Sequence, residues 1–128
     1  MTAADIRLKI PHEKPYHGIA RLVVGGVAAR LDLSYEHLDD LQLALGTVLE
    51  NEGYSQSAEV TVELRVREGG VEMAIGPLHA TEVRTDLEKN GEAVSLRRLL
   101  STVVERVELE QRADGGWLHL EKRIPLAG

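Results

Sequence analysis

The sequence contains no cysteine, and this single absence excludes several kinds of site. Disulfides, Cys-ligated zinc, iron–sulfur clusters and thiol nucleophiles all depend on that residue. No stretch approaches the roughly 18 apolar residues of a membrane span, and the N-terminal MTAADIRLKIPHEKP has no apolar core of a signal peptide. We therefore expect a cytoplasmic protein without a membrane partner.

Positive charge is scarce as well. The 128 residues include 15 Lys and Arg against 21 Asp and Glu, which gives a formal net charge of -6. An acidic surface repels phosphate backbones, so a nucleic acid is not an expected partner. Basic segments of other proteins would be attracted instead.

The sequence also lacks common catalytic signatures. It has no GxSxG or Walker motif, and its histidines show no metal-ligand spacing such as HExxH. Trp117, the single tryptophan, alternates with leucines, and we predict that it packs rather than serves as a stacking platform. We interpret all five histidines as structural or surface residues: His12, His17, His37, His79 and His119.

Hydrophobic periodicity predicts one domain over residues 1–128. Residues 4–11 alternate apolar and charged side chains, as a strand does, and residues 16–33 carry apolar residues at helical spacing. Gly25 and Gly26 interrupt that helix, and we interpret them as allowing close packing of another backbone. A second helix begins after Ser34 and is predicted to stop around Asn51 and Gly53, whose residue types suit a helix C-terminus.

The second half of the chain predicts two hairpins separated by a loop and a helix. Residues 58–76 alternate on both sides of Gly69 and Gly70, and residues 106–124 do so around Asp114. Residues 77–93 show no convincing period, which predicts a long loop with room for a short helical piece. Residues 95–107 predict a helix capped by Ser95. This order predicts an α+β two-layer sandwich, with a mixed and mostly antiparallel sheet covered on one face by helices.

Asn51 admits two interpretations. An asparagine before Glu52 and Gly53 is ordinary chemistry for stopping a helix. On the same helix, Ala44, Thr47 and Asn51 fall on one side at about 100° per residue, where they would line a pocket between helix and loop.

Two strings carry a resemblance to a known family: IARLVVGGVAARLDLSYEHLDDLQLALGTVLEN at residues 19–51 and SLRRLLSTVVERVELE at residues 95–110. Over residues 6–124 the chain resembles the small anti-sigma-factor serine kinases of the GHKL (Bergerat-fold) ATPase superfamily, which are bacterial switch proteins of sporulation and general-stress control. In that family the first string holds a helix with an arginine and then a helix with the N-box. The resemblance implies a Bergerat-type α+β fold.

The resemblance also implies a degenerate nucleotide site. In active relatives the N-box is a glutamate followed four residues later by an asparagine. The asparagine ligates the Mg²⁺ of ATP, and the glutamate is the base for the attacking hydroxyl. Asn51 matches the asparagine, but Thr47 matches the glutamate. Because a threonine hydroxyl is not basic near neutral pH and general-base catalysis contributes about 10²–10⁴-fold, we expect no catalytic residue here and severely reduced kinase activity.

Other motifs of the family are altered as well. Pro77, Leu78 and His79 match the Asp-x-Gly segment that holds the adenine, and none of them is a carboxylate. The glycine-rich phosphate lid is reduced to Gly91. Arg21 matches the arginine that faces protein partners in the family, although a solvated helix arginine is an equally good interpretation.

The resemblance therefore implies an anti-sigma-factor-like homodimer that binds a sigma factor, a STAS-type anti-anti-sigma protein, or both, with no or weak binding of Mg-ATP or Mg-ADP. Two alternatives stay open. One is an ATP-dependent serine kinase of a STAS partner, with Glu50 or Glu52 as a substitute base. One step along a helix turns a side chain by about 100°, however, and so points it in another direction. The other is a structural dimerisation module whose vestigial pocket is plugged by Leu78.

Overall fold

The computed structural model describes residues 4–31, 33–89 and 95–124. Within these ranges five strands form one open sheet in the order β1-β2-β3-β5-β4, and every pairing between them is antiparallel. Alternation of apolar and polar residues gives each strand one face toward the core and one toward solvent. The strands are β1 (Ala4–Pro11), β2 (Glu59–Arg67), β3 (Gly70–Leu78), β4 (Arg106–Arg112) and β5 (Gly115–Arg123).

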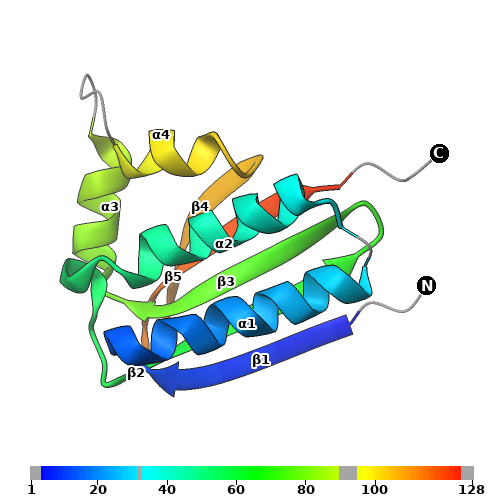
Figure 1. Ribbon diagram of the computed structural model, residues 1–128. Helices are drawn as coiled ribbons and strands as arrows, with labels where there is room; N and C mark the ends of the chain where they lie inside the picture. The colour runs from blue at the N-terminus through cyan, green and yellow to red at the C-terminus, as the bar shows by residue number, and fades with distance from the viewer. Residues whose placement is uncertain (1–3, 32, 90–94, 125–128) are drawn as a thin grey trace.

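The helices cover one face of this sheet (Figure 1). α1 (Lys14–Arg30) and α2 (Tyr35–Leu49) run side by side across it, and a short 3-10 helix, η1 (Glu52–Tyr54), follows α2. α3 (Ala80–Glu88) contacts β4 and β5, and α4 (Leu96–Ser101) contacts β4. The predicted two-layer α+β architecture is thereby confirmed. Across the described ranges, each helix is too short or too polar to span a bilayer.

The core forms where α2 lies against the sheet. Ser34 caps this helix, as predicted, by accepting a 3.2 Å hydrogen bond from the His37 backbone. The apolar side of α2 is at most 3% exposed and consists of Leu41, Ala44, Leu45, Val48 and Leu49. The same cluster includes sheet residues that are at most 2% exposed: Val62, Leu64, Met73, Ile75 and Leu118. Because burying one large aliphatic side chain contributes about 1.5–3 kcal/mol, this contact fixes the position and rotation of α2.

The structure corrects the loop predicted at residues 77–93. β3 continues to Leu78, and the following segment forms α3. Val83 and Leu87, one turn apart, are 0% and 6% exposed and attach this helix to the core. Two buried apolar residues in a helix of 9 residues give too weak a period to be detected in the sequence. Residues 90–94, which include Gly91, lie outside the described part of the chain.

The helix predicted at residues 95–107 is shorter in the structure. Ser95 does cap it, accepting a 3.2 Å hydrogen bond from the Arg98 backbone, but α4 ends at Ser101. Val103 lies in the turn that follows, and Val107 already belongs to β4. Both are buried, but one through a turn and the other through a strand, so their helical spacing in the sequence is a coincidence.

Within the described chain, the glycine pair of α1 makes no close contact with another backbone. A Cβ on Gly25 would lie 3.5 Å from the Gln42 amide, which is an ordinary contact, and one on Gly26 would meet no described atom within 4 Å. The close approach occurs at Gly46 of α2, where a Cβ would lie 3.0 Å from the Arg21 guanidinium.

The opposite face of the sheet is charged. The side chain of Glu63 is 11% exposed and binds the guanidinium groups of Arg7 and Arg112 at 2.5 and 3.3 Å. Arg112 also lies 4.0 Å from the centre of the Trp117 ring. Trp117 itself is 4% exposed and donates a 2.8 Å hydrogen bond to Asp114. The prediction that Trp117 is a packing residue is confirmed.

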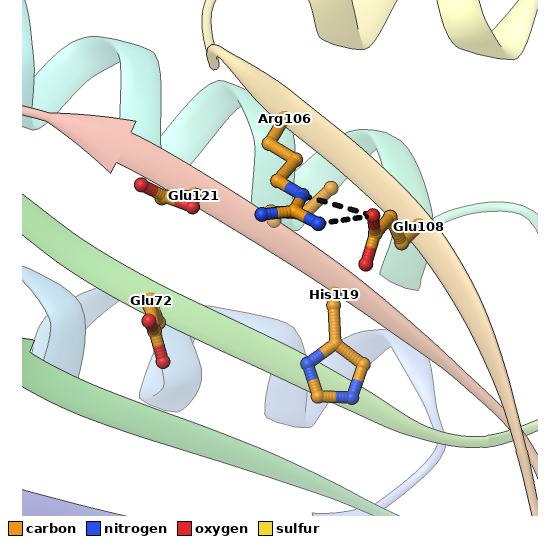
Figure 2. Close-up of a pocket in the computed structure, with 6 residues that line it drawn as sticks. Glu72, Arg106, Glu108, His119 and Glu121 are labelled. Atoms are coloured by element: carbon orange, nitrogen blue, oxygen red, sulfur yellow. Dashed lines mark hydrogen bonds and ion pairs between the residues drawn. The ribbon is translucent and has the colours of Figure 1, made fainter.

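A hollow of about 160 Å³ lies on the same face of the sheet (Figure 2). Arg106 donates hydrogen bonds of 2.9 and 2.6 Å to Glu108, while Glu72, His119 and Glu121 project from β3 and β5 around them. Among the described residues no three His, Cys, Asp or Glu side chains are arranged to hold a metal ion. We therefore assign this hollow to the solvated, charge-paired surface of the sheet.

Glu63→Gln tests how much the ion pairs of this face contribute. Burial by itself would raise the pKa of the Glu63 carboxyl, but the hydrogen bonds and charges of Arg7 and Arg112 outweigh it and hold that pKa below its ordinary 4.5. A carboxyl with a lowered folded pKa adds stability above its unfolded pKa, and this stability is lost as pH falls through the folded value. We expect the substitution to reduce the unfolding free energy at neutral pH by about 1–3 kcal/mol.

Urea unfolding of both proteins at neutral pH and at about pH 3 measures this difference, which should shrink at the lower pH. Glu59→Gln is the matched control, because Glu59 lies on the same face of β2 with its side chain 55% exposed. It should change stability by no more than about 0.5 kcal/mol. A loss in Glu63→Gln that is equal at both pH values contradicts the assignment.

Candidate functional site

α2 presents its two polar flanks to different neighbours, and one flank faces α3 and α4. There Thr47 and Asn51 line a cavity of about 280 Å³. The structure therefore brings together the two residues that the sequence placed on one side of the helix, whereas Ala44 is fully buried in the core. The remaining lining comes from η1 and from the α3 and α4 segments: Tyr54, Asp86, Lys89, Ser95, Leu96 and Leu99.

We predicted that Asn51 would end α2, but in the structure it begins the next turn. α2 ends at Leu49 with Glu50 as its C-cap, and Asn51 has an extended backbone with φ -83 and ψ 103. Its side-chain oxygen accepts a 3.0 Å hydrogen bond from the Gly53 backbone and so caps η1. This bond fixes the amide beside the cavity and occupies one of the two acceptor positions of its oxygen.

Thr47 contributes a hydroxyl that is already hydrogen-bonded. Its Oγ1 donates to the Leu43 carbonyl at 2.8 Å, the local bond that Ser and Thr often make within helices. The two carboxylates considered as substitute bases lie elsewhere. Glu50 forms an ion pair with Arg21 of α1, and Glu52 lines a separate cavity near the start of α1.

α3 supplies a carboxylate to the cavity that the sequence analysis missed. Tyr54 donates a 2.5 Å hydrogen bond to Asp86 Oδ2, and Lys89 Nζ lies 3.3 Å from Asp86 Oδ1. Tyr54 is 2% exposed, and burial together with the Asp86 carboxylate raises the pKa of its hydroxyl, so it remains a proton donor. Asp86 was not predicted as a site residue, because the apolar residues of the segment 77–93 show too little helical periodicity.

The three residues that match the adenine-binding segment have other positions. Leu78 is fully buried in the core, and Pro77 is half-buried in β3. His79 is the exposed N-cap of α3, and its backbone N–H donates a 2.9 Å hydrogen bond to the Tyr54 carbonyl. β3 therefore leads directly into α3 at the position that matches the Asp-x-Gly segment of the family.

The other flank of α2 faces α1. Arg21 pairs with Glu50, and its guanidinium lies over Gly46, where the missing side chain makes room for it. Gln42 donates a 3.1 Å hydrogen bond to the Arg21 carbonyl and so links the two helices. The ion pair could not be predicted from the sequence, because its two residues lie 29 positions apart.

A groove of about 470 Å³ lies between α1 and α2 at this point. Its lining is formed by Arg21, Asp39, Asp40, Gln42, Leu43, Gly46, Thr47 and Glu50. Leu43 is 58% exposed, and the same pair of helices exposes Ile19 to 44% and Leu22 to 76%. The groove itself combines the exposed Leu43 with carboxylates, and Thr47 lines both the groove and the cavity on the other flank.

No family model matches the chain, but curated relatives named serine-protein kinase RsbW do. The chain is 33% identical to RsbW of Oceanobacillus iheyensis over 75 residues, which is 55% of this chain and 48% of the relative. It is 35% identical to RsbW of Bacillus velezensis over 80 residues, which is 58% of this chain and 50% of the relative. These alignments span about half the length of the curated relatives.

A longer alignment, with RsbW of Halalkalibacterium halodurans, has 21% identity over 125 residues and covers 83% of this chain and 75% of the relative. Among solved structures, the RsbU and RsbW domains of Rv1364c from Mycobacterium tuberculosis match with a TM-score of 0.67 and 14% identity. That match covers 94% of this chain and 32% of the other. At such low identity it establishes a shared fold.

The structural role of Asn51 can be measured apart from any ligand. We expect Asn51→Ala to lower the unfolding free energy by about 0.5–2 kcal/mol, because η1 loses its cap. Asn51→Ser keeps a capping oxygen and should lose only a few tenths of that amount. Urea unfolding of the three proteins tests this expectation, and equal destabilisation by both substitutions contradicts the capping role.

Proposed function

We propose that this chain, a divergent relative of the RsbW serine-protein kinases, acts as an anti-sigma-factor-like regulator that binds protein partners and transfers little or no phosphate. The partner that we infer from the family resemblance is a sigma factor or a STAS-type anti-anti-sigma protein in the cytoplasm. The observation that carries the proposal is the groove between α1 and α2, which combines the exposed Leu43 with carboxylates.

The chemistry of the groove indicates what kind of segment it would bind. Leu43 remains 58% exposed, and covering such a side chain is favourable by about 25 cal/mol per Å². Asp39 and Glu50 line the same groove and provide negative charge, in a chain of net charge -6. These features suit an amphipathic helix whose apolar side is flanked by Lys or Arg.

The cavity on the other flank supports weak or absent nucleotide binding. The Asp86 carboxylate faces the space that a polyphosphate would need, and like charges repel. Asn51 and Asp86 offer the oxygen atoms that Mg²⁺ prefers, but Asn51 is engaged with Gly53 and Asp86 with Tyr54 and Lys89.

Two substitutions in the groove test partner binding. Leu43→Asp should weaken the complex with the sigma factor or STAS protein encoded beside the gene by about tenfold or more, because a charge replaces an apolar contact. Asp39→Asn should mainly slow association and reduce its dependence on salt. Calorimetry and surface plasmon resonance at micromolar concentrations measure both effects.

Glu59→Gln serves again as the control, since it changes the charge by the same amount on the opposite face of the molecule. It should leave affinity and rate unchanged. The proposal fails if the wild-type protein forms no complex at micromolar concentrations, or if the control weakens binding as much as the groove substitutions do.

An ATP-dependent serine kinase is the second candidate function, and one observation favours it. The Asp86 carboxylate lies in the same cavity as Asn51, so a base could come from α3 rather than α2. In this case the hydrogen bond from Tyr54 and the ion pair with Lys89 would have to break before Asp86 accepted a proton.

Calorimetry with Mg-ATP and transfer of radiolabelled phosphate to a STAS protein separate the two functions. We expect no nucleotide binding tighter than roughly 100 µM, which corresponds to about −5.5 kcal/mol, and no transfer above background. Thr47→Glu should remain inactive as well, because a base is of no use in a cavity that does not hold ATP. Phosphate transfer by the wild-type protein that is lost in Asp86→Asn would establish the kinase instead.

A further inference from the structure

A second cavity lies between the start of α1 and the end of α2, and the proposed function makes no use of it. Its volume is about 690 Å³. The residues that matter for its chemistry are His12, Glu13, Lys14, His17, Glu50 and Glu52. Two histidines, one before α1 and one inside it, are thereby brought to the same space.

Three of the four ring nitrogens of these histidines are covered and lack a hydrogen-bond partner among the described residues. His17 is 5% exposed, and neither of its ring nitrogens has a partner in the described structure. His12 Nδ1 is covered and unpaired as well, while its Nε2 lies 3.4 Å from the Leu49 carbonyl. Each covered and unpaired polar atom costs about 1–3 kcal/mol, so two adjacent rings in this state indicate a missing ligand.

The geometry of the rings indicates which ligand. Their centroids are 5.9 Å apart and their planes are tilted by 59°. With Zn–N bonds of about 2.0–2.1 Å, two imidazoles on one ion place their centroids about 5–6 Å apart. The observed separation of the rings therefore falls within the range that a shared ion requires.

The charges around the rings also favour a cation. Glu13, Glu50 and Glu52 line the cavity against the single cation of Lys14.

We propose that His12 and His17 bind a divalent transition-metal ion such as Zn²⁺ or Ni²⁺, with water or the carboxylate of Glu52 in the remaining positions. Imidazole nitrogens suit these ions and not Mg²⁺. The described residues contain no set of three or more ligand side chains already gathered around one point, so the two imidazoles define the site. The spacing of His12 and His17 across the β1–α1 junction differs from the helical spacing of known metal-binding motifs. The sequence analysis therefore did not predict this site.

Metal titration of the protein without a polyhistidine tag tests this site directly. Calorimetry with Zn²⁺ and with Ni²⁺ should show one ion per chain with a dissociation constant in the micromolar range, and Mg²⁺ should give no heat. His12→Gln should weaken binding by about tenfold or more. His17→Gln should do the same if circular dichroism shows that it folds, and His12, which is only half-buried, keeps the test valid if it does not.

His37→Gln and His79→Gln are the matched controls, because they remove histidines at other places on the surface. They should leave the affinity unchanged. NMR spectra that correlate side-chain nitrogens with ring protons should show shifts at His12 and His17 on addition of Zn²⁺. The proposal is overturned if no ion binds below millimolar concentration, or if binding survives in His12→Gln and is lost in a control.

Discussion

The contact between α2 and the sheet is the interaction on which the other features depend. Its apolar side is almost completely buried, and a rotation of the helix would expose aliphatic side chains at about 1.5–3 kcal/mol each. The helix therefore has one stable orientation. With that orientation fixed, Thr47 and Asn51 necessarily face α3 and α4, while Gly46 and Glu50 face α1.

The two flanks have different chemical characters as a result. Toward α3 and α4 the polar groups are satisfied by one another, since Asp86 is held by Tyr54 and Lys89 and the Asn51 oxygen caps η1. Toward α1 the surface remains open, with exposed apolar side chains and carboxylates. Both hollows open to solvent, and they differ in chemistry: one is lined by hydrogen-bonded polar groups and the other by the exposed Leu43 beside carboxylates. Glu50 lines both the groove and the histidine cavity, so the surface continues toward the start of α1.

Sequence reasoning succeeded where one physical signal dominates. The strands and α2 have strong periods because each buries one full face. The caps Ser34 and Ser95 were predicted because a serine hydroxyl before a helix commonly accepts a hydrogen bond from its first turn. It failed where local patterns are weak or misleading. α3 buries only Val83 and Leu87, and Val107 has helical spacing although it belongs to a strand.

The sequence by itself determined the two-layer class and the order of the strands, α1, α2 and α4. These features depend on residue type and on spacing within one segment. Only the tertiary structure decided that Asp86 shares a cavity with Asn51, that Arg21 pairs with Glu50 across Gly46, and that His12 and His17 are neighbours. Each of these depends on how separate elements pack. The whole core, and no single segment, sets how α3 packs on the sheet, how α1 packs beside α2, and how β1 turns into α1.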